Sequence, residues 1–144
     1  FIYLITWKNK AFDYKFDAIV YCIFTSLGFA FLENLVYCFN YGLTTALLRA
    51  IISVPGHAFF AIYMGYYLGI AKMYHTKKEV NKTSEYTLYS ILIPTALHGI
   101  YDYCLISGHI GLYILFIVFI ITLYILAFKT INTSSNMDMA FKSD

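Results

Sequence analysis

Long apolar runs separated by short polar connections are the main pattern along the chain. Crossing a bilayer takes roughly 20 apolar residues in a helix, and the run 43–74 is too long for one straight span. Pro55 and Gly56 divide that run, because proline removes a backbone donor and clashes with the preceding turn. We predict a short interfacial or re-entrant helix over 44–53 before the span that follows. The predicted complete spans are 17–39, 54–74, 87–106 and 110–128.

The two ends of the chain differ from these spans. Residues 1–6 read as the end of a longer apolar helix, and the chain has neither an initiating methionine nor a charged leader. We therefore expect an N-terminal truncation. Residues after 129 are polar, which predicts a transmembrane domain over 1–129 and a disordered tail over 130–144. We also expect a tight turn at 107–109 and a kink at Pro94.

Composition shows which solvent these helices face. Hydrophobic residues make up 60% of the 144 residues and charged residues only 12%, whereas a soluble domain has about a quarter charged residues. Such a chain has too little polar surface for water, so we expect an all-α, multi-pass bundle in a lipid bilayer. The net charge of +2 gives no sign of a nucleic-acid partner.

The lysines indicate the orientation of the chain. They occupy alternate connections of the four-span path, while the connections 40–53 and 107–109 contain only Arg49. Because lysine and arginine in short loops favour the cytoplasm, we predict that the lysine-rich loops and the C-terminus are cytoplasmic. The lysines are Lys8, Lys10, Lys15, Lys72, Lys77, Lys78, Lys82, Lys129 and Lys142.

Small residues inside the apolar runs are predicted to serve packing. Cys22, Cys38 and Cys104 fit no metal-binding spacing, and an odd number of cysteines cannot form a complete disulfide set. Free cysteine packs as a small hydrophobic residue. Gly65 and Gly69 form a small-xxx-small pair, which is typical of close contacts between membrane helices.

Ionisable residues inside the spans are few. Each costs about 2.5–3.5 kcal/mol on insertion scales, so each needs a reason. They are Glu33, beside Asn34, then His57, then His98 with Asp102. At about 1.5 Å per residue, Glu33 lies roughly 10 Å, Asp102 about 7 Å and His98 about 13 Å below the outer end. His57 lies roughly 4 Å or more into its span. We therefore predict one polar cluster in the outer half of the bilayer.

Local spacing refines this cluster. His98 and Asp102 are four residues apart, so they share one helix face and the carboxylate can orient the imidazole. Two residues keep alternative roles. Asn34 is either part of the cluster or an interhelical hydrogen bond, and Arg49 either anchors to lipid headgroups or neutralises charge above the cluster.

Four motifs around these positions resemble the PrsW family of bacterial membrane proteases in order and spacing. They are GFAFLENLVY at 28–37, LRA at 48–50, VPGHAFF at 54–60 and LHGIYD at 97–102. This family is distantly related to the CAAX prenyl endopeptidases and the abortive-infection membrane proteases. The resemblance covers residues 12–103, and residues 110–144 carry no family motif.

The resemblance implies regulated intramembrane proteolysis in a bacterial cell membrane. The expected substrate is a membrane-anchored protein such as an anti-sigma factor, cut first on the extracytoplasmic side. The family also has a Glu-Glu-x-x-Lys motif on the helix before the segment that matches Phe1. That motif is absent here, so we expect that the fragment lacks a catalytic glutamate pair and is inactive alone.

Peptide hydrolysis needs an activated water and stabilisation of an oxyanion. The hypothesis is that Glu33 activates water, and that His57 and His98 position this water or polarise the scissile carbonyl. Asp102 orients His98, and Asn34 donates to the oxyanion. This version needs no cofactor. The alternative is a zinc ion held by His57, His98 and Glu33 with one open water position.

Two other classes of protein use such residues differently. A transporter or proton relay could employ the same Glu, His and Asp groups, with helices broken at Pro55 and Pro94. A non-catalytic membrane scaffold would not need so many buried charges.

Overall fold

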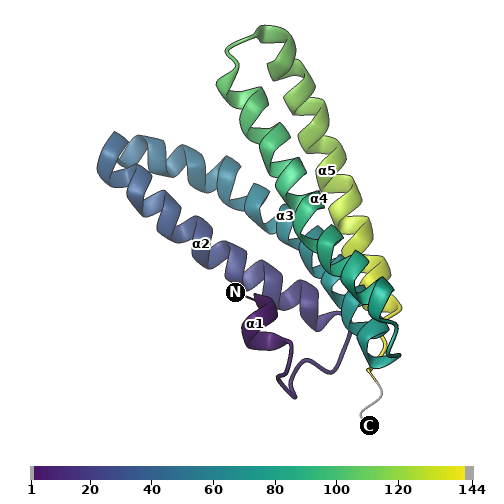
Figure 1. Ribbon diagram of the computed structural model, residues 1–144. Helices are drawn as coiled ribbons and strands as arrows, with labels where there is room; N and C mark the ends of the chain where they lie inside the picture. Colours follow the sequence, from purple (N-terminus) through teal and green to yellow (C-terminus); the bar gives the residue numbers. More distant parts are fainter. Residues whose placement is uncertain (1, 142–144) are drawn as a thin grey trace.

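The computed structural model describes residues 2–141, which fold into five helices joined by short connections (Figure 1). No β-strand occurs within residues 2–141, so the predicted all-α class is confirmed. The helices are α1 (Ile2–Thr6), α2 (Asp17–Tyr41), α3 (Leu43–Thr76), α4 (Val80–Ile106) and α5 (Ile110–Asn136).

Three of these helices are long and apolar enough to cross a membrane. They are α2, α3 and α5, as judged by length and composition. Helix α4 has 27 residues but is less apolar, and it begins at Val80 where the sequence predicts a start at Thr87. A span formed by α4 therefore stays a prediction.

Helix α3 runs without interruption from Leu43 to Thr76. The predicted break at Pro55 and the separate helix over 44–53 are therefore wrong. Proline removes one backbone hydrogen bond, and membrane helices tolerate this loss where neighbouring groups satisfy the freed carbonyl. At about 1.5 Å per residue, α3 is about 51 Å long, well beyond a hydrocarbon core of about 30 Å.

The C-terminal part of the chain is more ordered than the sequence predicts. Helix α5 continues through the predicted boundary at residue 129 and ends at Asn136, so residues 130–136 are helical and not a disordered tail. Ser134 in this extension is buried, and Ile131 packs against the core. The predicted tail residues 142–144 lie outside the described residues.

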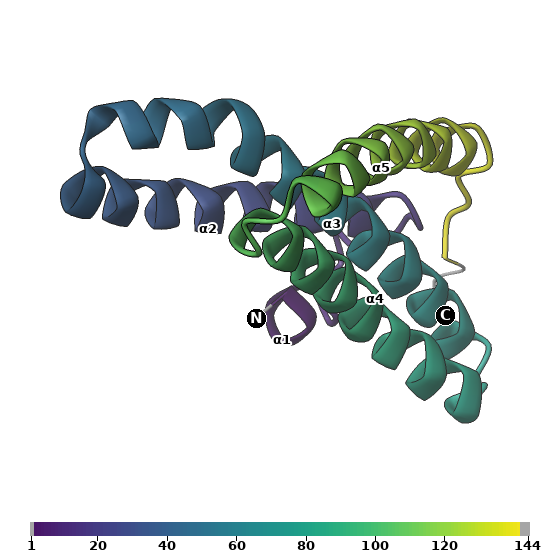
Figure 2. The ribbon, with the colours of Figure 1, turned by 90° about the horizontal axis from the view of Figure 1, so that it is seen from above.

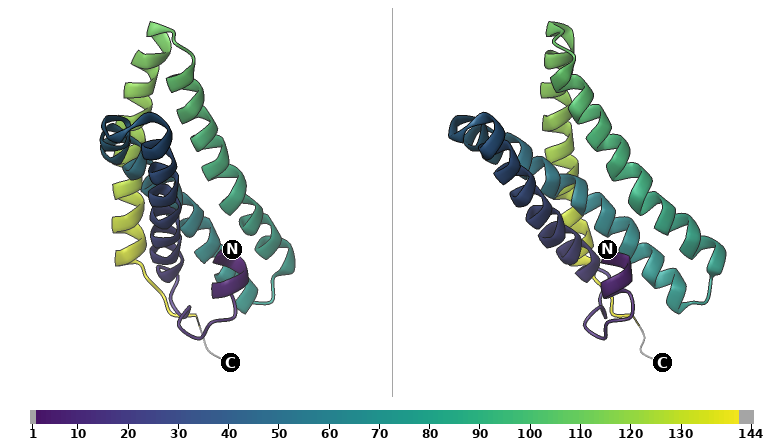
Figure 3. Two further views of the ribbon diagram at one scale, coloured as in Figure 1. Left: turned by 90° about the vertical axis from the view of Figure 1, so that its left-hand side faces the viewer. Right: turned by 60° about the vertical axis from the view of Figure 1, so that its left-hand side comes forward.

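The helices form two arms that share α3 (Figures 1 and 2). Helix α2 and the first half of α3 make one arm, and α4 with α5 makes the other. The arms diverge toward one end of the molecule (Figure 3), and no Cα atom of α2 lies within 8 Å of one of α4. This arrangement leaves α3 as the only helix that connects both arms.

The connections alternate between the two ends of the bundle (Figure 1). Gly42, with a φ of 86°, and the predicted turn at 107–109 lie at the diverging end. The α1–α2 connection, the short loop 77–79 and the chain after α5 lie at the opposite end. The lysine-rich connections thus share one end, as the alternating path predicts.

Close helix contact at glycine is confirmed for Gly65. A Cβ atom there would lie 2.7 Å from the Ala18 carbonyl oxygen, and one at Gly69 would lie 2.5 Å from the Lys15 carbonyl oxygen. The two glycines therefore let α3 approach the start of α2 closely. Cys22 and Cys104 are buried and unbridged, as expected for packing residues.

Candidate active site

Helices α2 and α3 bring Glu33, Arg49 and His57 into direct contact. Glu33 Oε2 lies 3.1 Å from His57 Nε2, and Arg49 Nη2 donates to the same oxygen at 2.8 Å. The Arg49 guanidinium also lies over the Tyr37 ring at 3.6 Å. The His57 side chain is only 8% exposed. The Ser26 hydroxyl of α2 donates to the His57 backbone carbonyl at 3.0 Å, which ties this turn of α3 to α2.

Helix α4 contributes the second histidine. The His57 and His98 rings meet edge to face with centroids 5.1 Å apart, and Phe60 stacks on His98 at the same separation. His98 Nε2 lies 3.5 Å from Asp102 Oδ2, as the spacing of four residues predicts. Side chains from three helices therefore converge in one cluster.

This cluster lines a cavity of about 280 Å³ between α2 and α4, with α3 as its floor. Its wall carries four of the five predicted site residues. The cavity is large enough for several water molecules, since one water occupies about 30 Å³ of liquid. The lining residues are Glu33, Tyr37, Arg49, Ser53, His57, Phe60, His98, Tyr101, Asp102, Leu105 and Ile106.

Asn34 is the fifth predicted residue, and it does not line the cavity. Its amide group donates to the Ala46 carbonyl at 3.0 Å and so ties α2 to α3. The structure thus gives Asn34 the interhelical role that the sequence left as an alternative.

Tyr101 is a cavity residue that sequence reasoning missed. Its side chain is 3% exposed, and its hydroxyl is buried, with the Ser53 side chain as its polar neighbour in the cavity wall. The ring packs edge-on against Phe60 and Phe116, which fixes its orientation. The chain has 15 tyrosines, so residue type alone does not single out Tyr101. Its place on the same helix as His98 was the available sequence signal for a position in the site.

The arrangement does not show the zinc site that the sequence leaves as an alternative. Two imidazoles and a carboxylate are donors that zinc accepts. Within residues 2–141, however, no three His, Cys, Asp or Glu side chains lie close enough together to hold a metal ion. Arg49 and His57 share one oxygen of Glu33, and His98 Nε2 faces Asp102. These contacts engage donor atoms of Glu33, His57 and His98, so the described residues show no metal site.

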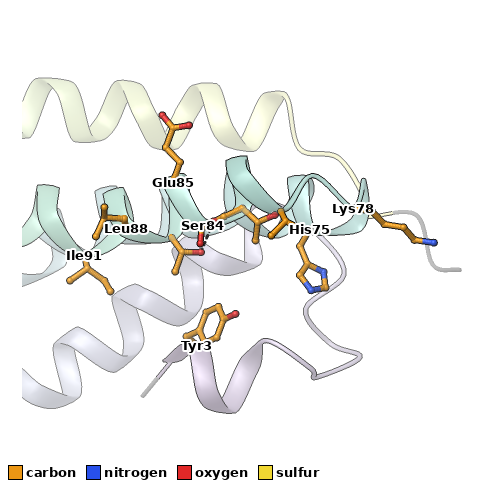
Figure 4. Close-up of a pocket in the computed structure, with 10 residues that line it drawn as sticks. Tyr3, His75, Lys78, Ser84, Glu85, Leu88 and Ile91 are labelled. Carbon is orange, nitrogen blue, oxygen red and sulfur yellow. Dashed lines mark hydrogen bonds between the residues drawn. The ribbon is translucent and has the colours of Figure 1, made fainter.

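A wider hollow lies at the opposite end of the molecule, between α1 and the start of α4 (Figure 4). His75 lines it and packs edge-on against Trp7 at 5.3 Å. Tyr3 and Glu85 also line this hollow. None of the predicted site residues does, so it is separate from the polar cluster.

Comparison with known proteins identifies relatives of this architecture. Residues 1–127 match the model of the PrsW family, described as intramembrane metalloproteases. Similar proteins from several organisms are called Protease PrsW, and three of them are described here in turn. The protein from Clostridioides difficile is 43% identical over 81% of this chain and 50% of its own length. That from Geobacillus kaustophilus is 41% identical over 74% of this chain and 45% of its own length.

A third relative, from Halalkalibacterium halodurans, is 31% identical over 95% of this chain and 61% of its own length. The chain thus spans about half the length of the curated relatives it matches. No solved structure matches this chain. Similarity to intramembrane proteases, together with three long apolar helices, supports a location in a membrane.

Proposed function

Because the chain belongs to the PrsW family of intramembrane proteases, we propose that the full-length protein hydrolyses a peptide bond in a membrane-anchored protein. One observation carries this proposal. Glu33, His57 and His98 come from three different helices and meet around one cavity. Charged and imidazole groups in membrane helices are costly, and such clusters are typical of functional sites.

The proposed reaction uses Glu33 and His57 to activate water. Glu33 takes the proton from a water molecule in the cavity, and its contact with His57 Nε2 at 3.1 Å orients the carboxylate. The water oxygen then attacks the scissile carbonyl carbon, and the carbonyl π-electrons move to oxygen. The oxyanion electron pair then re-forms the carbonyl double bond as the C–N bond breaks. His98, oriented by Asp102, passes the proton that Glu33 took from water to the leaving amine nitrogen.

The developing oxyanion needs a hydrogen-bond donor. We assign this role to the Tyr101 hydroxyl, which is buried in the cavity wall beside Ser53. This assignment replaces Asn34, whose amide is already bonded to α3. The tyrosine therefore completes a set of groups for acyl transfer to water.

The proposed substrate is a single-span protein such as an anti-sigma factor, cut near the extracytoplasmic surface. Two features support this choice. The cavity lies in the half of the molecule that carries the lysine-free turns, and lysine-rich connections favour the cytoplasm. The diverging arms also leave the cavity between α2 and α4, two helices whose Cα atoms are all more than 8 Å apart.

The family description includes a metal, and the residues described here do not form a ligand set for one. We therefore assign no step to a metal ion. Elemental analysis of the purified full-length protein, combined with chelator treatment during cleavage, tests this assignment. A stoichiometric metal whose removal stops cleavage would require a different mechanism.

The test of the function is cleavage of a tagged anti-sigma factor by the full-length protein in proteoliposomes. Replacing Glu33 by Gln, or His57 or His98 by Ala, should lower the cleavage rate about 100-fold or more, because general acid–base groups contribute about 10²–10⁴-fold. His109→Ala is the matched control, since His109 is exposed in a turn outside the cavity. All variants should insert normally.

Undiminished cleavage by all three site variants would refute the proposal. Proton flux is measured in the same proteoliposomes, because the transporter alternative uses the same residues. Flux that depends on Glu33, in the absence of cleavage, would favour the transporter.

A further inference from the structure

A second cavity, of about 340 Å³, lies at the lysine-rich end of the bundle. It is far along α3 from the catalytic cluster and shares no lining residue with it. Two lysines and several apolar side chains form its wall. The lining residues are Lys15, Met73, Thr76, Lys77, Met139, Ala140 and Phe141.

The wall opposite α3 is built from the two segments that flank the helical bundle. Residues 13–16 pair antiparallel with residues 138–141. Lys15 N donates to the Met139 carbonyl at 3.2 Å, and the Phe141 N–H donates to the Asp13 carbonyl at 2.6 Å. The cavity is therefore held by backbone hydrogen bonds and is not a gap between loose ends.

The Lys15 ammonium is a half-buried positive charge in this wall. It makes no ion pair with any carboxylate of residues 2–141, and its nearest recorded partner is the Tyr66 ring at 5.2 Å. Burial lowers the pKa of Lys15, and the more distant charge of Asp138 opposes that shift only in part. A half-buried cation without a counter-ion is unfavourable, so an anion in the cavity would stabilise it.

Lys77 supplies a second positive charge to the same cavity. Its ammonium lies over the Tyr74 ring at 5.6 Å and likewise makes no ion pair among the described residues. The end of a helix carries negative partial charge, which would repel an anion. Here the His75 carbonyl accepts from Lys78 N at 2.9 Å, and the Tyr74 carbonyl accepts from Glu79 N at 3.0 Å. Because these two carbonyls at the end of α3 already accept hydrogen bonds, they oppose an anion less.

Met73, Met139 and Phe141 give the cavity an apolar side. A ligand that matches it has a phosphate group on one side and hydrocarbon on the other. Anionic phospholipids have this chemistry at the level of the membrane surface, where each lysine contributes about 1 kcal/mol to binding. We propose that this cavity binds the phosphate headgroup of an anionic phospholipid through Lys15 and Lys77.

The test uses native mass spectrometry of the full-length protein released from nanodiscs that contain phosphatidylcholine and phosphatidylglycerol. The wild type should retain phosphatidylglycerol in preference to phosphatidylcholine. Lys15→Gln and Lys77→Gln should each weaken retention roughly fivefold, and the double variant should weaken it roughly 25-fold. Lys10→Gln is the matched control, because Lys10 is exposed on the same connection and does not line the cavity.

Two further arms separate the possible outcomes. Lys15→Arg keeps the charge and should retain the lipid, which distinguishes lost recognition from a general folding defect. Inorganic phosphate is titrated against the lipid-free protein, with thermal stability as the readout. Stabilisation by phosphate alone, without preference for phosphatidylglycerol, would overturn the lipid assignment. Equal lipid retention by the wild type and the double variant would overturn the site itself.

Discussion

At the residue scale, Glu33 has two partners on a single oxygen. Arg49 donates to Oε2 at 2.8 Å and His57 Nε2 lies 3.1 Å from the same atom. A carboxylate in a membrane helix is costly unless it is paired, and Arg49 provides that pairing from the neighbouring helix. Stacking on Tyr37 holds the guanidinium in place. Arg49 is thus a positioning residue for Glu33.

Arg49→Gln should lower both stability and cleavage, because it leaves the Glu33 carboxylate without its cation. Removing one partner of a fully buried pair costs 3–5 kcal/mol. The two side chains here are 21% and 30% exposed, so we expect about 1–2 kcal/mol after screening by solvent. The measurement is thermal unfolding in detergent, together with cleavage of the anti-sigma-factor reporter.

A second variant isolates this charge effect. The double variant Glu33→Gln, Arg49→Gln leaves no uncompensated charge and should be more stable than Arg49→Gln alone. Arg49→Lys should recover only part of the loss, because an ammonium lacks the planar group that stacks on Tyr37. Equal stability of the single and double variants would contradict the positioning role.

Tyr101 provides another test at this scale. Tyr101→Phe removes only the hydroxyl, and the ring keeps its contacts with Phe60 and Phe116. Loss of one oxyanion donor typically lowers kcat by about 10²–10³, so we expect a fall of that order with an unchanged KM. The control is Tyr103→Phe, since Tyr103 is 66% exposed on the same helix. Wild-type kcat in Tyr101→Phe would remove this residue from the mechanism.

At the element scale, polar spacing predicted the site better than helix boundaries did. Glu33, His57, His98 and Asp102 were expected at one cavity because each is a costly exception in an apolar run, and the structure places all four there. The sequence did not reveal that Arg49 contacts Glu33. Arg49 and His57 lie on either side of Pro55 in the same helix. One missing backbone N–H donor does not determine whether a membrane helix breaks at proline, so the sequence could not place Arg49 relative to the cluster.

The seam between α2 and α3 is also testable at this scale. Gly65→Ala places a methyl group against the backbone of Ala18 and Ile19, which cannot move aside like a flexible side chain. Overpacking of this kind costs about 1–3 kcal/mol, so the melting temperature should fall. Gly111→Ala is the control, because its added methyl meets nothing within 4 Å. Equal melting temperatures for the two variants would argue against a tight seam.

At the scale of the whole molecule, the helices place the lysine-rich connections at one end and the turns at Gly42 and 107–109 at the other. The positive charge should hold the first end in the cytoplasm. We therefore expect a cysteine at position 109 to react with a membrane-impermeant maleimide in intact cells. A cysteine at position 78, in the short loop after α3, should react only after permeabilisation. The reverse pattern would put the catalytic cluster near the cytoplasmic surface.

The turn at Gly42 fixes the relative positions of Glu33 and His57. One residue with a φ of 86° joins α2 directly to α3, and its N–H donates to the Cys38 carbonyl at 2.9 Å. The connection between α2, which carries Glu33, and α3, which carries His57, is a single residue. Each residue advances a helix by about 100°. Inserting a single amino acid at this joint would therefore turn the face of α3 that carries His57 away from α2. The direct joint at Gly42 therefore sets which face of α3 meets α2, and a one-residue insertion there should separate Glu33 from His57.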